Sequence, residues 1–85
     1  MNWELRVDKI VAKELSKVSK KDAERVFKVI KSLAFNPYYG DIEKIKDEDS
    51  AWRRRVGSYR IFYEVNKNQK FIHVTDVKRR TSKTY

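Results

Sequence analysis

Four arginines in the second half of the chain have the residue type and spacing to bind a phosphate group. Arg53, Arg55 and Arg60 lie close together, and Arg79 follows further along. Arginine stays protonated at neutral pH, and its planar fork of donors fits phosphate oxygens. We expect these four side chains to form a phosphate clamp. The alternative is a solvated basic surface that binds nucleic acid loosely or only keeps the protein in solution.

Three flat side chains accompany these arginines. Phe62, His73 and Tyr85 offer surfaces on which unpaired bases can stack, which favours single-stranded RNA over a duplex. For Phe62 and Phe71, ordinary packing under a partner or loop is the favoured role, and a lone histidine on a strand is most often a bystander.

A groove of arginines can support RNA cleavage because RNA carries its own nucleophile, the ribose 2′-hydroxyl. The protein must then supply charge stabilisation, positioning and proton transfer. Arginine, with a pKa above about 12, is a poor proton donor or acceptor. We therefore expect proton transfer to come from Tyr85 or His73.

The overall charge also indicates a polyanionic partner. The 85 residues include 21 Lys and Arg against 12 Asp and Glu, a net charge of +9, and such a surface attracts polyanions. Residues 1–50 are nearly balanced, whereas residues 51–85 hold most of the excess. We therefore place the polyanion surface in the C-terminal 35 residues.

The composition excludes several kinds of site. With no cysteine and one histidine, the chain cannot form disulfides, an iron–sulfur cluster or a thiolate zinc site, so no metal or cofactor is expected. No apolar run approaches a membrane span and no secretion signal is visible. We expect one small domain over residues 1–85, in the cytoplasm, with no membrane partner.

Hydrophobic periodicity predicts a strand and two helices in the first half. Apolar residues alternate with charged ones over residues 3–7, as in a strand with one buried face. A helical period begins near Lys9, with Asp8 as its cap. Ser19 caps a second helix, which ends at Asn36-Pro37.

Three strands are predicted in the second half. Residues 52–56, 59–65 and 70–77 are rich in β-branched and aromatic side chains and are separated by turn residues. Residues 41–50 are expected to form a loop or a frayed helical turn. The order β-α-α-β-β-β predicts an α+β fold, in which an N-terminal helical hairpin packs on one face of an antiparallel-rich four-stranded sheet.

Strand alternation assigns side chains to the two faces of this sheet. Ile61, Tyr63 and Val65 should face the helices, and Arg53, Arg55, Arg60 and Phe62 should face away. If Ile72 and Val74 face the core, the residues that alternate with them also face away, namely Phe71, His73, Thr75, Val77 and Arg79. All four arginines would then share one open face.

These residues resemble a known family along nearly the whole chain. Segment Trp52–Val65 joins a basic strand to Gly57-Ser58-Tyr59-Arg60, and a later segment holds Lys78-Arg79 and then Tyr85. This arrangement is similar to the RelE/ParE superfamily of toxins from type II toxin–antitoxin systems. The resemblance is stronger to its RelE branch of ribosome-dependent mRNA interferases.

The resemblance implies a RelE-like fold and a metal-independent endoribonuclease. Such a toxin enters the ribosomal A site, cuts mRNA there by 2′-hydroxyl attack to leave a cyclic phosphate, and so inhibits translation. A cognate acidic antitoxin neutralises it. Matching positions imply catalytic roles for Arg53, Arg55, Arg60, Arg79 and Tyr85. The residues expected to contact RNA are Arg54, Phe62, His73, Lys78, Arg80 and Lys83.

The chain also departs from the family pattern. Well-studied RelE members have lysines where this chain has Arg53 and Arg55, which leaves the proton-transfer group open. Arg54 replaces an apolar residue on the core side, so it should reach outward or pair with a carboxylate. Two other functions stay open: a ParE-like inhibitor of DNA gyrase and a non-catalytic RNA-binding relative.

Overall fold

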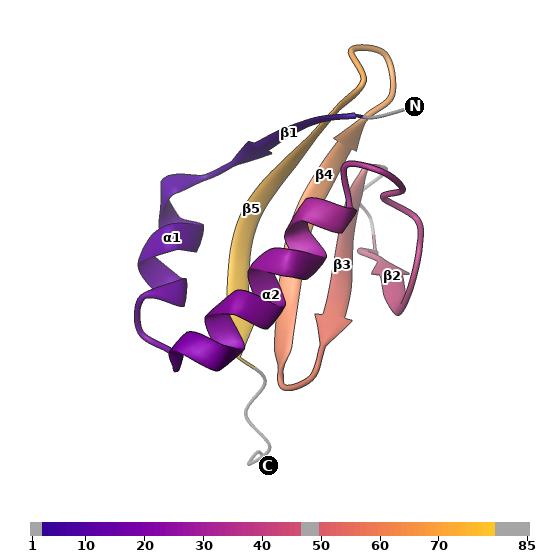
Figure 1. Ribbon diagram of the computed structural model, residues 1–85. Coiled ribbons are helices and arrows are strands. Elements are labelled where there is room, and N and C mark those ends of the chain that lie inside the picture. The colour runs from indigo at the N-terminus through magenta and orange to yellow at the C-terminus, as the bar shows by residue number, and fades with distance from the viewer. Residues whose placement is uncertain (1–2, 47–49, 80–85) are drawn as a thin grey trace.

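Two helices cover one face of a mixed sheet in the computed structural model, which describes residues 3–46 and 50–79 (Figure 1). The elements are β1 (Glu4–Val7), α1 (Lys9–Leu15), α2 (Lys20–Ser32), β2 (Ile42–Lys44), β3 (Ala51–Val56), β4 (Tyr59–Asn66) and β5 (Phe71–Arg79). The strand order is β1-β5-β4-β3-β2, with β1 parallel to β5 and the other pairs antiparallel. The predicted α+β fold with a largely antiparallel sheet is confirmed, with one more strand than expected.

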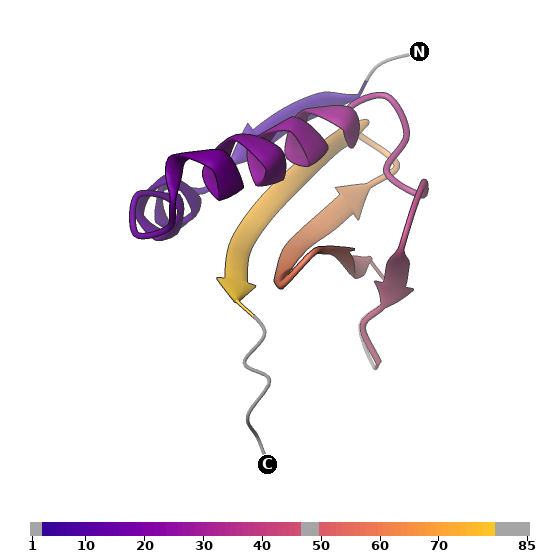
Figure 2. The same cartoon turned by 60° about the horizontal axis from the view of Figure 1, so that its bottom comes forward.

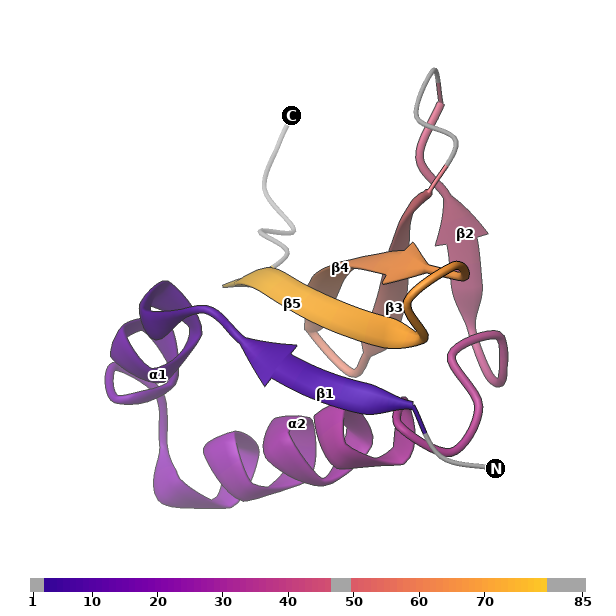
Figure 3. The same cartoon turned by 90° about the horizontal axis from the view of Figure 1, so that it is seen from above.

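The helices begin at the predicted caps. The Asp8 carboxylate accepts a hydrogen bond from the backbone N–H of Ile10, and the Ser19 hydroxyl oxygen accepts one from the N–H of Asp22. Each cap satisfies a donor that the first helical turn leaves unpaired. Both helices lie on the same side of the sheet and leave its other side open (Figures 2 and 3).

The core lies between the helices and this covered side of the sheet. Ile61, Tyr63 and Val65 of β4 are buried, as predicted from alternation. They pack in one cluster with residues of β5 and with the apolar stripes of both helices, including Ile72, Val74, Val11, Val26, Ile30 and Leu33. Hydrophobic burial therefore fixes which face of the central strands remains free.

Strand β2 lies where the sequence predicted a loop or a frayed turn. It has three residues, too few for an alternating pattern to be visible, and two of them are charged. Pairing with β3 creates the strand, with Ile42 opposite Arg54 and Glu43 opposite Arg53. Because this pairing is a tertiary contact, local propensity did not reveal it.

A β-bulge changes the phase of β5. Tyr63 lies opposite Val74 but Phe62 lies opposite Asp76, so Thr75 is the extra residue, and its hydroxyl donates to the carbonyl oxygen of Phe62 at 3.2 Å. Beyond the bulge, Val77 is 3% exposed. The prediction that Val77 and Arg79 face away from the helices was therefore wrong, because a bulge shifts alternation by one residue.

Arg79 illustrates the consequence of this shift. The register places Arg79 opposite Tyr59, in phase with the helix-facing residues. Its neighbour Lys78 lies opposite Arg60 instead, on the open face of the sheet.

Neither helix could span a membrane. Within the two described segments, no helix is long and apolar enough to cross one.

Candidate nucleic-acid interface

Three of the four predicted arginines meet on the open face. Arg53 lies opposite Phe62, and Arg55 lies opposite Arg60, so alternation sends all three arginine side chains to the side away from the helices. They line one narrow groove together with Asp41 and Glu43. We call these five residues the arginine groove.

Two carboxylates of the edge strand region enter this groove. The Glu43 Oε1 atom accepts hydrogen bonds from Nη2 and Nε of Arg53 at 2.6 and 3.1 Å. The Asp41 Oδ2 atom lies 3.9 Å from Nε of Arg55. The antiparallel register explains both pairs, because alternate residues of one strand oppose alternate residues of the next.

The arginines keep Glu43 ionised. The hydrogen bond from Arg53 lowers the pKa of Glu43 most, and the positive charges of Arg53, Arg55 and Arg60 lower it further. An ionised carboxylate can accept a proton, which an arginine cannot do. Our sequence reasoning missed this carboxylate. Its signal was the alternation of Asp41 and Glu43, which matches that of Arg53 and Arg55.

Arg60 differs from its two neighbours in the arginine groove. Its side chain is half-buried, and its Nε atom is buried with no hydrogen-bond acceptor among residues 3–46 and 50–79. A buried donor without a partner is costly, and a charged acceptor is the strongest partner for a guanidinium group. Arg60 therefore keeps donors for an anion, as does Arg55, whose side chain has only the 3.9 Å ion pair with Asp41 among the described residues.

A hollow of about 430 Å³ adjoins the groove on the open face. Phe62, Ile45 and Ala51 line it, with Asp76 and Lys78. Because Phe62 lies opposite Arg53, its ring is next to the groove. The predicted stacking surface is thus placed where it can receive a base attached to a groove-bound phosphate.

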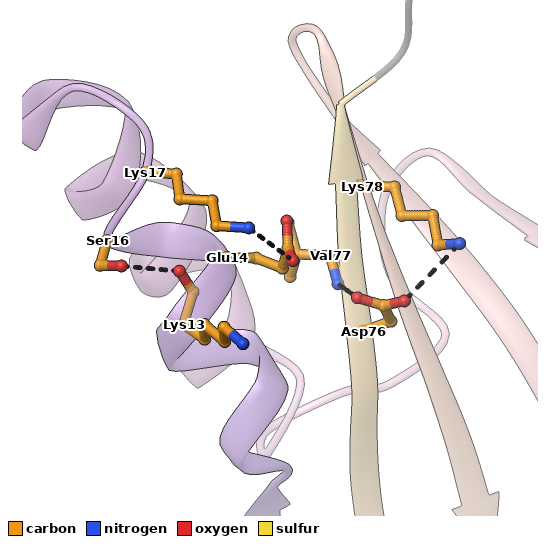
Figure 4. Close-up of polar contacts among 7 residues, drawn as sticks. All are labelled: Lys13, Glu14, Ser16, Lys17, Asp76, Val77 and Lys78. Carbon is orange, nitrogen blue, oxygen red and sulfur yellow. Dashed lines mark hydrogen bonds and ion pairs between the residues drawn. The ribbon is translucent and has the colours of Figure 1, made fainter.

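Lys78 lies on the same side as this hollow. Its ammonium nitrogen is 3.8 Å from an Asp76 carboxylate oxygen, and the backbone N–H of Val77 donates to the other oxygen at 2.8 Å. Figure 4 shows Asp76 and Lys78 projecting from β5 on the side away from α1, whose Glu14 pairs with Lys17. Since Lys78 lies opposite Arg60, it is well placed beside the predicted phosphate site.

Two other predicted residues lie away from the groove. The His73 Nε2 atom is 3.7 Å from a carboxylate oxygen of Asp8, on the β1 side of the sheet. Arg79 lies near Tyr59, whose hydroxyl donates to Asp22 at 3.0 Å on the helix side. Burial, and then this hydrogen bond, raise the pKa of Tyr59.

The remaining predicted residues divide into two groups. Arg80, Lys83 and Tyr85 lie outside the described residues, so their roles stay predictions. Arg54 points to the helix side, where its Nη1 atom donates to the backbone carbonyl of Tyr39 at 3.1 Å. Among the described residues it has no carboxylate partner, so a backbone oxygen takes the place of the expected carboxylate.

The two helices form a second basic surface, in the half of the chain whose total charge is nearly balanced. Residues 9–32 hold eight basic and three acidic side chains. An apolar groove of about 440 Å³ lies between α1 and α2. Val7, Val11, Leu15 and Phe27 help to line it, and Phe27 is 45% exposed. Lys20 and Glu24 also line it, and exposed apolar surface bordered by polar residues is typical of an interaction site.

Comparisons with known proteins agree with this fold along nearly the whole chain. The family described as ParE toxin of type II toxin-antitoxin system, parDE, matches residues 3–83. An archaeal RelE–RelB complex from Pyrococcus horikoshii contains a similar chain, with 26% identity and a TM-score of 0.82 over 98% of this chain and 100% of that one.

Two further structures are similar. The RelB–RelE complex of Methanococcus jannaschii gives 28% identity and a TM-score of 0.72 over 87% of this chain and 88% of that one. The isolated RelE toxin of E. coli gives 18% identity and a TM-score of 0.79 over 95% and 87%, a likeness of fold alone. The sequence of this chain matches no curated protein.

Proposed function

Because the chain belongs to the ParE toxin family of type II toxin–antitoxin systems, within the RelE/ParE superfamily, we propose that it is a toxin that cleaves mRNA in the ribosomal A site. One observation carries this proposal. The arginine groove brings three arginine side chains together with a carboxylate whose pKa is lowered, Glu43. These are the two kinds of group that 2′-hydroxyl attack on a phosphodiester requires.

Glu43 is the proton acceptor in this mechanism. It takes the proton of the ribose 2′-hydroxyl, and the oxygen attacks the adjacent phosphorus. Arg53, Arg55 and Arg60 stabilise the negative charge that develops on the phosphate oxygens. Because Arg53 already donates to Glu43, RNA must share this guanidinium with the carboxylate.

Lys78 supplies the other proton transfer. The bond between phosphorus and the 5′ oxygen breaks, and the leaving oxygen takes a proton from the ammonium group opposite Arg60. The products are a 2′,3′-cyclic phosphate and a 5′-hydroxyl. The base beside the cleaved bond stacks on Phe62, and the ribosome holds the strand in line for attack.

A second candidate function is inhibition of DNA gyrase. The family match to ParE toxins over residues 3–83 favours it, since toxins of the ParE branch poison DNA gyrase. If the protein inhibits gyrase, the arginine groove is not a site of phosphodiester cleavage. Substitutions in the groove would then leave toxicity unchanged.

Glu43→Gln tests the cleavage mechanism. We expect cleavage to fall by about 100-fold, because the amide keeps the size of the side chain but cannot accept the proton. Glu4→Gln is the matched control, since Glu4 also pairs with an arginine, Arg6, and also has a lowered pKa, but lies outside the groove. Primer extension in a purified translation system, with and without ribosomes, measures the cuts.

The two proposals give different results in this experiment. Cuts within A-site codons that need ribosomes and Glu43, and that survive Glu4→Gln, support an mRNA interferase. Intact mRNA with the unaltered protein would refute it, and a DNA supercoiling and cleavage assay would then test the gyrase alternative.

The proposed partner is an acidic antitoxin. The similar archaeal chains occur in complexes with RelB. An amphipathic helix with an acidic rim fits the apolar groove between α1 and α2, because residues 9–32 carry eight basic and three acidic side chains. We expect Phe27→Asp to weaken antitoxin binding by at least about tenfold, because Phe27 is an exposed aromatic anchor. Titration calorimetry with the antitoxin measures this change, and unchanged affinity would show that the antitoxin binds another surface.

A further inference from the structure

We propose that Arg54 is a positioning residue that holds the 37–41 segment, and with it β2 and Glu43, at the arginine groove. This inference rests on the proposed function for its catalytic consequence but on contacts alone for the positioning. Arg54 lies on β3 between two groove arginines, yet its side chain leaves on the opposite face of the sheet. It therefore cannot act by touching RNA in the groove.

The 37–41 segment is shaped around the Arg54 guanidinium group. Nη1 of Arg54 donates to the carbonyl oxygen of Tyr39 at 3.1 Å. The next residue, Gly40, has a φ of +92°, and a Cβ atom there would overlap the guanidinium. Glycine suits this position because of its positive φ, and its lack of a side chain leaves the space in which the Arg54 guanidinium group lies. This fit indicates a specific contact.

Strand β2 is held on the open face by Glu43, which bonds to Arg53, whereas on the helix side the preceding segment is held by Arg54 and by the Tyr63 hydroxyl at Pro37. Strand β2 is a three-residue edge strand, hydrogen-bonded on one side only. Beside its own ladder, the N–H of Arg55 donates to Asp41 and the N–H of Ile45 donates to Ala51, each at 2.9 Å. Short edge strands open at low free energy unless side chains anchor them. Arg54 provides such an anchor opposite Ile42.

Stability does not account for an arginine at this position. The side chain is half-buried and its Nε atom is buried with no acceptor among the described residues. A well-packed apolar side chain would avoid that cost, and such replacements are often neutral or stabilising. Arg54→Leu should therefore keep the fold while it releases the 37–41 segment, which separates positioning from stability.

Hydrogen exchange tests the positioning without any need for activity. In Arg54→Leu we expect the amides of Arg55 and Ile45 to exchange at least tenfold faster than in the unaltered protein, with Ile61 in central β4 unchanged. Arg6→Leu is the matched control, since Arg6 is an arginine on the other edge strand that contacts Glu4 and Phe71. Unchanged exchange at Arg55 and Ile45 would overturn the inference, as would equal acceleration at Ile61.

Kinetics test the catalytic consequence. We expect Arg54→Leu to lower kcat at least tenfold with less than a threefold change in KM, and Arg54→Lys to recover part of kcat, because a lysine can still donate to the Tyr39 carbonyl. Released from Arg53, Glu43 regains a higher pKa, so the acid limb of the pH–rate profile should move to higher pH. A change confined to KM would contradict positioning.

Failures of the two proposals are distinguishable. If the unaltered protein cuts no RNA while Arg54→Leu still speeds exchange at Arg55 and Ile45, the proposed function is wrong and the positioning role stands. If Arg54→Leu does not fold, Arg54→Gln serves instead, since it stays polar but is too short to reach the Tyr39 carbonyl. The same exchange pattern is then expected.

Discussion

Neighbouring arginines on β3 have different surroundings. Arg53 lies on the open face, where its guanidinium bonds to the Glu43 carboxylate. Arg54 lies on the helix side, where it bonds to the backbone of the 37–41 segment. The difference shows that neighbouring residues of like charge on one strand can have different roles. Strand alternation divides them into side chains that can bind an anion and a side chain that holds the structure beside it.

The two faces also differ in how charge is balanced. On the open face, Asp41 and Glu43 offset part of the charge of Arg53 and Arg55, and no carboxylate within the described segments pairs with Arg60. On the helix side at the end of β5, Arg79 lies opposite Tyr59, whose hydroxyl donates to Asp22. The open face therefore combines compensated and uncompensated arginines within one groove.

Replacing one arginine from each face gives the largest expected contrast. We expect Arg60→Ala to lower mRNA cleavage by at least about 100-fold, because Arg60 is the groove arginine that no carboxylate pairs with among the described residues. We expect Arg79→Ala to lower cleavage less, by about tenfold, because the bulge places Arg79 on the helix side, away from the arginine groove. Single-turnover cleavage on ribosomes measures both rates. A larger loss for Arg79→Ala would show that RNA binds across the end of the sheet.

The bulge in β5 predicts a contrast in stability between two adjacent residues. We expect Val77→Ala to lower the free energy of unfolding by about 2 kcal/mol, because Val77 packs in the core cluster. Lys78→Ala, at an exposed site, should change it by less than about 0.5 kcal/mol. Urea denaturation followed by tryptophan fluorescence measures both. Similar values for the two variants would argue against the register beyond Thr75.

Tyr63 gives the smallest expected effect and concerns the second contact of the 37–41 segment. Its hydroxyl donates to the carbonyl oxygen of Pro37 at 2.5 Å, and burial raises its pKa from 10.0 to about 12. Tyr63→Phe should lower the free energy of unfolding by about 1 kcal/mol at neutral pH.

The same shift gives a dependence on pH with a definite sign. Above pH 10 the unfolded chain loses the Tyr63 proton before the folded protein does, so stability should fall between pH 10 and about 12. Tyr63→Phe should therefore have a flatter stability profile in this range. Denaturation curves from pH 8 to 12 measure the slope, and equal slopes for both proteins would show that this hydroxyl titrates normally.

Sequence periodicity was sufficient for much of the fold. The caps at Asp8 and Ser19 and the buried face of β4 were predicted, because they depend on residues close together in the chain. The placement of Arg53, Arg55 and Arg60 on one open face followed from the same alternation. Local spacing therefore determined the helices, the core face and three of the groove residues.

Tertiary structure decided the rest. Strand β2 exists because it pairs with β3, and only that pairing brings Asp41 and Glu43 to the arginines. The bulge at Thr75 inserts one residue opposite β4 and turns Arg79 to the helix side. Both features depend on the register between strands that are separate in sequence. That register is set by how the whole core packs, which no local pattern of residues contains.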